Sequence, residues 1–113
     1  YELDYSDEEV LVLSYGITSR VAHRAIKESR AEGKRAGHLR LKTIWPFPAK
    51  LLESILGRGQ VKHVVVPEIN MGQLVLEVER LAAGRVQVTH VPHAGGAVHH
   101  PSVIRQAIEE AAS

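Results

Sequence analysis

The feature of this sequence that most constrains its fold is a regular alternation of short strand-like runs with longer stretches of helical periodicity. A continuous apolar run at 10–15 is typical of a strand covered on both faces, and residues 61–66 are expected to form another strand. Residues 37–43 alternate polar and apolar side chains, which predicts a strand with one wetter face, and 85–91 is a fourth strand. A helical pattern follows each strand, and the connections are too short for anything but crossover units. The sequence therefore predicts a mostly parallel sheet between two helix layers.

Composition excludes several classes of function. The 113 residues carry a net charge of +1 with neutral histidines and no basic block, so charge does not favour binding to nucleic acid or a membrane surface. Without cysteine, the chain can form no disulfide, cysteine nucleophile, thiolate metal site or cysteine-held iron–sulfur cluster. A signal-peptide pattern is not seen, so we expect a cytoplasmic location. The only methionine is Met71, which favours a domain cut from a longer protein.

A glycine-led turn follows the first expected strand. Gly16 and Thr18 lie where a helix begins, and helix-start N–H groups attract anions. The turn lacks both the G-x-G-x-x-G pattern and the lysine of a P-loop. A tight strand-to-helix turn is therefore the favoured interpretation, with an anionic-ligand site as the alternative.

Glu68 ends the third expected strand, and Asn70 and Gly72 lead into the next helix. Glu68 could accept hydrogen bonds from a ligand or a partner domain. Alternatively, the helix dipole stabilises the carboxylate by roughly 0.3–1 kcal/mol. Because no second acid and no histidine–serine or histidine–aspartate arrangement stands nearby in sequence, catalysis by this domain alone is disfavoured, although distant residues could converge in the fold.

Two further groups have open interpretations. Four histidines cluster near the carboxyl terminus; they are His90, His93, His99 and His100. Their spacing contains no H-x-x-x-H pair, so adventitious metal binding is favoured over a dedicated site, and the position of His100 before Pro101 suits a helix cap. A rigid, partly apolar knob serves equally well as core cover or as a docking surface; its residues are Trp45, Pro46, Phe47 and Pro48.

Three motifs, in this order and spacing, resemble a known family. They are SYGITSRVAHRAIKESRAEG (14–33), LRLKTIWPFP (39–48) and VVVPEINMGQL (64–74). Together they look like the carboxyl-terminal domain of the α-subunit of 2-oxoacid:ferredoxin oxidoreductases, nearest to the 2-oxoglutarate branch. The resemblance implies a fold like the transketolase carboxyl-terminal domain. This is a three-layer α/β/α sandwich whose mostly parallel five-stranded sheet has one antiparallel edge strand. Residues 1–9 are then expected to be a linker from a preceding domain, and residues 10–113 the domain itself.

The resemblance also implies a function. Enzymes of this family oxidatively decarboxylate a 2-oxoacid, here expected to be 2-oxoglutarate, to an acyl-coenzyme A and reduce ferredoxin. They use thiamine diphosphate with magnesium, iron–sulfur clusters and coenzyme A, at sites in other domains or in a β-subunit. This chain is therefore expected to hold no cofactor, to be inactive alone, and to act as an assembly domain. Its expected partners are the rest of its α-subunit and the β-subunit, with ferredoxin as partner of the holoenzyme.

The resemblance assigns an interface role to two turns. The motif match covers Glu68, Asn70, Gly72 and Gln73, and the adjacent turn contributes Gly16, Thr18 and Arg20. The last loop departs from the family, which usually has a threonine or serine before the proline and an acid after it. Three alternatives stay open: another thiamine enzyme of the E1β or transketolase type, a free-standing module for an anionic ligand, and a metal sensor built on residues 90–100.

Overall fold

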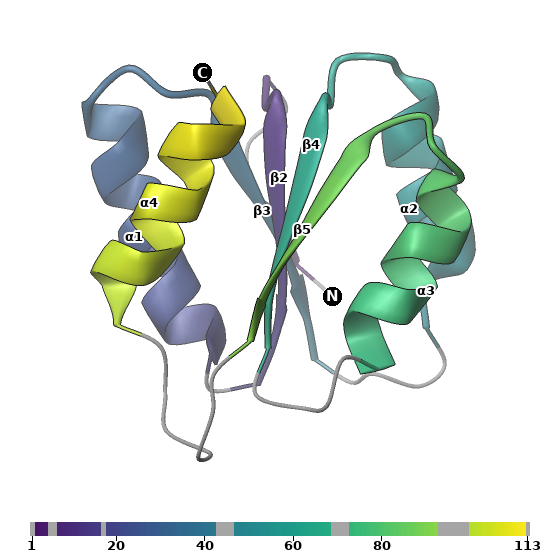
Figure 1. Ribbon diagram of the computed structural model, residues 1–113, viewed down its shortest axis with the longest axis horizontal. Coiled ribbons are helices and arrows are strands. Elements are labelled where there is room, and N and C mark those ends of the chain that lie inside the picture. Colours follow the sequence, from purple (N-terminus) through teal and green to yellow (C-terminus); the bar gives the residue numbers. More distant parts are fainter. Residues whose placement is uncertain are drawn as a thin grey trace.

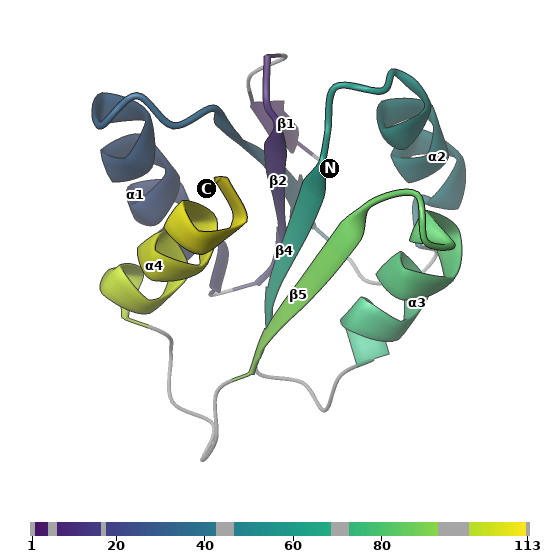
Figure 2. The same ribbon diagram turned by 45° about the horizontal axis from the view of Figure 1, so that its top comes forward.

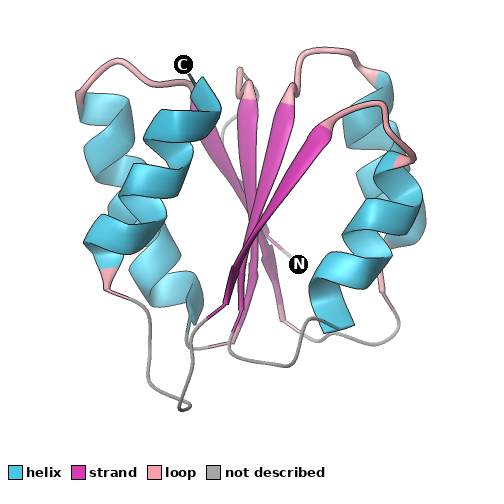
Figure 3. Cartoon of the chain, viewed as in Figure 1, coloured by secondary structure: helices cyan, strands magenta, loops and turns pink. Residues whose placement is uncertain are grey.

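The computed structural model describes residues 2–4, 7–16, 18–42, 47–68, 73–92 and 100–112 (Figure 3). The strands are β1 (Glu2–Asp4), β2 (Val10–Tyr15), β3 (Ala36–Leu41), β4 (His63–Glu68) and β5 (Gln87–Pro92). The helices are α1 (Thr18–Ala31), α2 (Ala49–Gly57), α3 (Gln73–Ala82) and α4 (Pro101–Ala112). Within these described ranges, no helix has both the length and the apolar character that crossing a membrane requires.

The strands form one sheet in the order β1-β3-β2-β4-β5. Strands β2 to β5 pair in parallel, and β1 pairs antiparallel with β3, placing Asp4 opposite His38. Helices α1 and α4 cover one face and α2 and α3 the other (Figures 1 and 2). The expected three-layer sandwich with one antiparallel edge strand is therefore confirmed.

The antiparallel edge strand comes from a part of the sequence that was expected to be linker. Residues 2–4 pair with β3, and the side chain of Glu8 is fully buried. Glu8 packs against Gly37, where an added Cβ would lie 2.7 Å from the Cβ of Glu8, and one Glu8 oxygen accepts a hydrogen bond from Arg58 at 3.0 Å. A run of three residues is too short to predict a strand from its pattern of polar and apolar side chains. Strand β1 is therefore recognised only by its pairing with β3. The exact boundary with any preceding domain stays a prediction.

Side-chain alternation along the strands divides the core between the two faces. Leu11 and Leu13 of β2 join the cluster under α2 and α3, while Val10 and Val12 join the cluster under α1 and α4. Successive side chains point to opposite faces of a strand, so a continuous apolar run fills both layers at once. Each fully buried leucine or valine contributes roughly 1.5–3 kcal/mol.

The prediction of a wetter face on β3 is wrong for His38. Arg40 is exposed as expected, but the side chain of His38 is only 2% exposed because it lies beneath α1. The alternation correctly placed both side chains on one face. It did not show that a helix from a different part of the chain covers only one of them.

The order of the strands sets the position of a natural binding edge. The chain leaves β2 through α1 toward β3, and leaves β4 through α3 toward β5, on opposite faces of the sheet (Figure 1). Strands β2 and β4 are neighbours, so the connections diverge between them. Open α/β sheets bind ligands or partners at the carboxyl ends of strands beside such a switch point. Gly16 and Glu68 lie at these two strand ends.

Candidate functional site

Glu68 closes the start of helix α3. Its side chain is 4% exposed, and its two oxygens accept hydrogen bonds from the backbone N–H groups of Leu74 at 3.1 Å and Val75 at 3.0 Å. These N–H groups belong to the first turn, where a helix has no internal acceptors and carries partial positive charge. Hydrogen bonds to a charged group contribute about 1.5–3 kcal/mol each. The fold therefore engages both oxygens of the acid that the sequence singled out.

His90 approaches the same carboxylate from β5. Its Nε2 atom lies 3.3 Å from Oε2 of Glu68, which is ion-pair distance once the imidazole is protonated. The approach is not aligned as a hydrogen bond, and among the described residues this buried nitrogen has no hydrogen-bond partner. His90 therefore contacts Glu68 at the junction between β4 and α3.

The turn at Gly16 closes on itself. Gly16 has a φ of +66°, its carbonyl accepts a hydrogen bond from the N–H of Ser19 at 3.0 Å, and the hydroxyl of Thr18 donates to the carbonyl of Tyr15 at 2.6 Å. A positive φ is favourable for glycine and strained for other residues. These bonds are those of a tight strand-to-helix turn. Arg20, in the first turn of α1, is exposed.

Basic side chains gather next to this turn. A hollow of about 570 Å³ is lined by Glu2, Gly16, Arg20, Arg40, Leu41 and Lys42. A carboxylate oxygen of Glu2 lies 4.0 Å from Arg40 and 3.7 Å from Lys42. The described residues of this lining therefore supply three cations and one acid, which suits an anionic group.

A chain of polar side chains lies buried between β2, β3 and α1. The Oγ atom of Ser14 lies 2.6 Å from Nε2 of His38 and 2.9 Å from Oγ of Ser19. Burial lowers the pKa of His38 to about 4, since the charged imidazolium would lose its hydration, and nearby Asp4 opposes this shift only in part. The combination of serine, histidine and aspartate resembles a hydrolytic triad. Ser14, however, is 0% exposed, and a nucleophile must reach its substrate, so the arrangement is structural.

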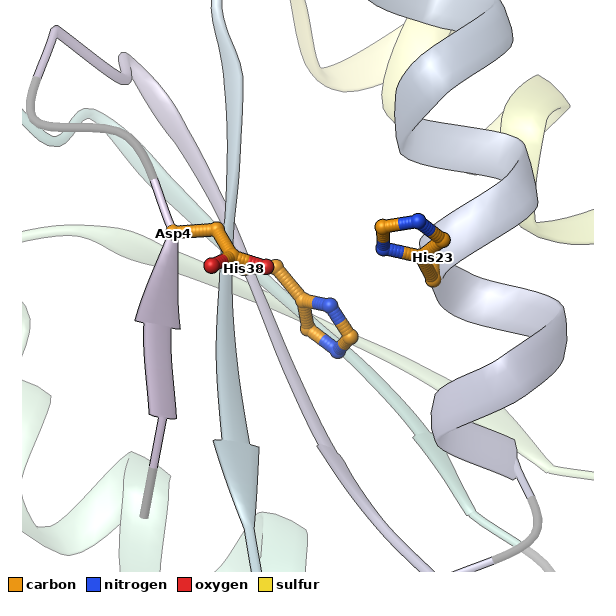
Figure 4. A group of neighbouring side chains, drawn as sticks. All are labelled: Asp4, His23 and His38. Atoms are coloured by element: carbon orange, nitrogen blue, oxygen red, sulfur yellow. The ribbon is translucent and has the colours of Figure 1, made fainter.

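Asp4, His23 and His38 form a second group that sequence reasoning missed. They come from β1, α1 and β3, and each offers a ligand atom that lies within 4.8 Å of the others (Figure 4). The three residues share no local motif. Knowing that Asp4 pairs opposite His38 would have been the only signal, and the short β1 run does not reveal it.

Several of the expected site residues lie outside the described ranges. They are Trp45, Pro46, Asn70, Gly72, His93 and His99. Among their described neighbours, Phe47 packs against the apolar cluster under α2 and α3, which supports core cover over docking for that ring, and Pro48 precedes α2 as its N-cap residue. Gln73 begins α3. The interface roles assigned to these residues stay predictions.

His100 caps helix α4. Its Nδ1 atom accepts a hydrogen bond from the N–H of Ser102 at 3.2 Å and lies 2.8 Å from the hydroxyl of Ser102. The ring nitrogen thus takes the place of the serine or threonine hydroxyl that usually caps a helix. This chain therefore differs from the family pattern in the residue that caps α4 but keeps the helix cap itself.

Comparisons with known proteins agree with this fold. Residues 8–104 match the family model described as pyruvate:ferredoxin oxidoreductase core domain II. The chain is 38% identical to the 2-oxoglutarate synthase subunit KorA of Methanothermobacter marburgensis over 98 residues, covering 87% of the chain and 26% of that subunit. It is 36% identical to the KorA subunit of Methanocaldococcus jannaschii over 108 residues, covering 96% of the chain and 28% of the subunit. The chain thus spans about a quarter of the length of these curated relatives.

Two solved structures share the fold. A 2-oxoglutarate:ferredoxin oxidoreductase from Magnetococcus marinus, solved with 2-oxoglutarate, coenzyme A and succinyl-CoA bound, superposes with a TM-score of 0.76 at 24% identity, over 99% of this chain and 19% of that one. An inactive β4 tetramer of a split-gene transketolase also gives a TM-score of 0.76, at 18% identity, over 96% of this chain and 39% of that one. The family match extends over most of the chain, from Glu8 to Ile104, and the architecture agrees with it: this chain belongs to the core domain II family of pyruvate:ferredoxin oxidoreductases.

Proposed function

We propose that this chain is the assembly domain of the α-subunit of a 2-oxoacid:ferredoxin oxidoreductase that acts on 2-oxoglutarate. The observation that carries the proposal is the family match, together with identities of 36–40% to three KorA subunits of 2-oxoglutarate synthases. The holoenzyme would convert 2-oxoglutarate and coenzyme A to succinyl-coenzyme A and carbon dioxide, and pass two electrons to ferredoxin.

The residues of this chain do not fit the redox and thiamine cofactors of such an enzyme. Without cysteine, the chain has no thiolate ligand for an iron–sulfur cluster. Among the described residues, Glu68 is the acid at the end of β4. Backbone N–H groups of helix α3 donate hydrogen bonds to both its oxygens, so this carboxylate is not available to a thiamine ring or a magnesium ion. We therefore assign thiamine diphosphate, magnesium and the clusters to other parts of the holoenzyme.

The part this chain would play is positional. Two helix starts, at Thr18 and Gln73, lie at the carboxyl ends of neighbouring strands. The Thr18 hydroxyl donates to the carbonyl of Tyr15, and Glu68 accepts hydrogen bonds from the first turn of α3. Arg20 and Arg40 near this edge are exposed. Exposed basic side chains at such an edge suit docking of an acidic surface of a neighbouring domain or of the β-subunit.

The mass of the native polypeptide and the proteins that copurify with it test the proposal. We expect a chain about four times longer than these 113 residues, by its relatives' coverage, that copurifies with a thiamine-containing β-subunit and reduces ferredoxin only when 2-oxoglutarate and coenzyme A are present. A native polypeptide of this size alone, without 2-oxoglutarate-dependent activity in any fraction, would contradict it. Pyruvate or 2-oxoisovalerate in place of 2-oxoglutarate tests the substrate.

One observation favours a second candidate, a module for an anionic ligand. The hollow beside Gly16 is lined by Arg20, Arg40 and Lys42 against the single acid Glu2. Calorimetric titration with coenzyme A, nucleotides and thiamine diphosphate distinguishes the two candidates. Saturable heat that disappears in Arg20→Gln would support this module, while no heat at millimolar ligand would remove it.

A further inference from the structure

Three side chains under helix α1 have the composition and convergence of a metal site. Asp4 reaches the site from β1, His23 from α1 and His38 from β3, and their ligand atoms lie within 4.8 Å of one another (Figure 4). Two imidazoles and one carboxylate are a frequent donor set for zinc sites with three protein ligands. We propose that Asp4, His23 and His38 bind a divalent transition-metal ion of the zinc type.

His38 is already oriented for this role. Its side chain is buried, and its Nε2 atom lies 2.6 Å from Oγ of Ser14, which in turn lies 2.9 Å from Oγ of Ser19. With Nε2 engaged, Nδ1 is the nitrogen that remains for a metal ion. Histidine ligands usually donate their other ring N–H to an acceptor that fixes the ring, and Ser14 supplies that acceptor here.

The other two ligands can adjust. Zinc holds nitrogen and oxygen ligands at about 2.0–2.2 Å, so tetrahedral ligand atoms lie roughly 3.3 Å apart. The present separations of up to 4.8 Å must therefore shorten by about 1.5 Å at most. His23 is exposed on α1 and Asp4 is half-buried, so rotation of these side chains can close the site around the fixed ring of His38.

The charges around the site balance. Its three ligands line a cavity of about 290 Å³ together with Glu2, Ser19, Arg20 and Arg40. The carboxylates of Asp4 and Glu2 offset the two guanidinium groups, so a cation does not enter a net positive field. Three protein ligands leave one tetrahedral position open to the cavity. Arg20 and Arg40 suit a water-derived hydroxide or a small carboxylate at that position.

Metal binding would fasten the edge of the sheet. Strand β1 has three residues, and among the described strands it pairs only with β3, where Asp4 lies opposite His38. An ion held by Asp4, His23 and His38 would link this short strand to both β3 and α1. The inference depends on these side chains alone, so it does not rest on the oxidoreductase function proposed above.

Zinc retention and zinc affinity test the proposal. Zinc retained through dialysis by the polypeptide that carries this chain is measured by mass spectrometry. A second sample of the same polypeptide is stripped with a chelator, dialysed and titrated with zinc chloride in a calorimeter. Zinc is the chosen probe because iron and magnesium belong to the expected holoenzyme cofactors. We expect stoichiometric zinc, a loss of about 100-fold or more in affinity in both His23→Gln and Asp4→Asn, and a loss of about 10-fold in Ser14→Ala.

The histidines near residue 100 provide the matched control. The double variant His93→Gln with His99→Gln should keep the affinity of the unmodified protein. Zinc at background in the unmodified protein would overturn the proposal, and so would zinc that is lost in this double variant but retained in His23→Gln. His23 is exposed, so its variant should melt like the unmodified protein in chelator; if Asp4→Asn does not fold, His23→Gln decides alone.

Discussion

The two faces of the sheet are each covered by two helices but differ in what they bury. Beneath α2 and α3 the core cluster consists mainly of leucine, valine and isoleucine, including Leu39 and Leu52. The two buried acids on this side, Glu8 and Glu68, lie at its margins, bonded to Arg58 and to the start of α3. Beneath α1 and α4 the cluster has smaller side chains such as Ala22 and Ala36, and the polar side chains of Ser14, Ser19 and His38 are buried nearby. Apolar burial stabilises without any requirement for partners, whereas each buried polar group costs free energy unless it is hydrogen-bonded.

The difference indicates that the two faces have different roles. The cluster under α2 and α3 contributes stability through packing, because its members are hydrocarbon side chains. The polar face satisfies its hydroxyl and imidazole groups through one chain of contacts, and the same imidazole belongs to the proposed metal site. The polar face should therefore respond to pH and to ligands as well as to changes in volume. The following predictions separate these two kinds of sensitivity.

The largest effect is expected on the apolar face. Leu52→Ala removes a side chain that is 0% exposed and leaves a cavity, so the free energy of unfolding should fall by about 3–4 kcal/mol. Urea unfolding followed by circular dichroism measures it. Leu76→Ala on α3 is the matched control, because Leu76 is 65% exposed and its loss should change stability by less than about 0.5 kcal/mol. Equal effects of the two variants would contradict the assignment of this core.

The polar face should make stability depend on pH through His38. Burial lowers the pKa of His38 from 6.5 to about 4, so between these values the unfolded chain binds a proton that the folded chain does not. Stability is then fully present above pH 6.5 and falls as pH drops toward 4, by about 3 kcal/mol in all. Urea unfolding from pH 7 to pH 4, in chelator to exclude metal, measures the slope.

The variant His38→Gln isolates this contribution. Glutamine can still meet Ser14 with a polar group but does not titrate, so its stability curve should be flatter over the same pH range. Asp4, His23 and Arg40 influence the charge on His38 and remain in both proteins, which makes the difference between the two curves specific to the imidazole. Parallel curves would show that His38 does not carry the pH dependence.

A third effect lies at the carboxyl edge of the sheet, where Glu68 meets the start of α3. Glu68→Gln keeps one acceptor oxygen but loses the charge and one of the two bonds to α3, so we expect a loss of about 2 kcal/mol. Hydrogen exchange at Leu74 and Val75 should rise more than exchange within α2. If the holoenzyme also dissociates more readily in this variant at full helix content, Glu68 has an interface role in addition to its cap.

The layers could be predicted from sequence because they depend on short-range patterns, and the site could not because it depends on long-range pairing. The run at 10–15 identifies a two-sided buried strand by itself. Glu68 was also visible, since an acid between a strand and a helix start is a local signal. Asp4, His23 and His38 are separated by 19 and 15 positions and belong to different elements. Only the antiparallel pairing of β1 and the docking of α1 bring them together.

The smallest predicted effect is also the most direct test of the polar chain. Ser14→Ala removes a hydroxyl but almost no volume, and it leaves Nε2 of His38 and Oγ of Ser19 without that partner in a buried site. We expect a loss of about 1 kcal/mol at pH 7, and coupling of similar size in a double-mutant cycle with His38→Leu, which removes the polar partner of Ser14, since contacting residues are not additive. Urea unfolding of the two single variants and the double variant measures the coupling. Additive effects would mean that Ser14 and His38 are neighbours without an energetic contact, and the ring of His38 would then lack the support that the proposed metal site requires.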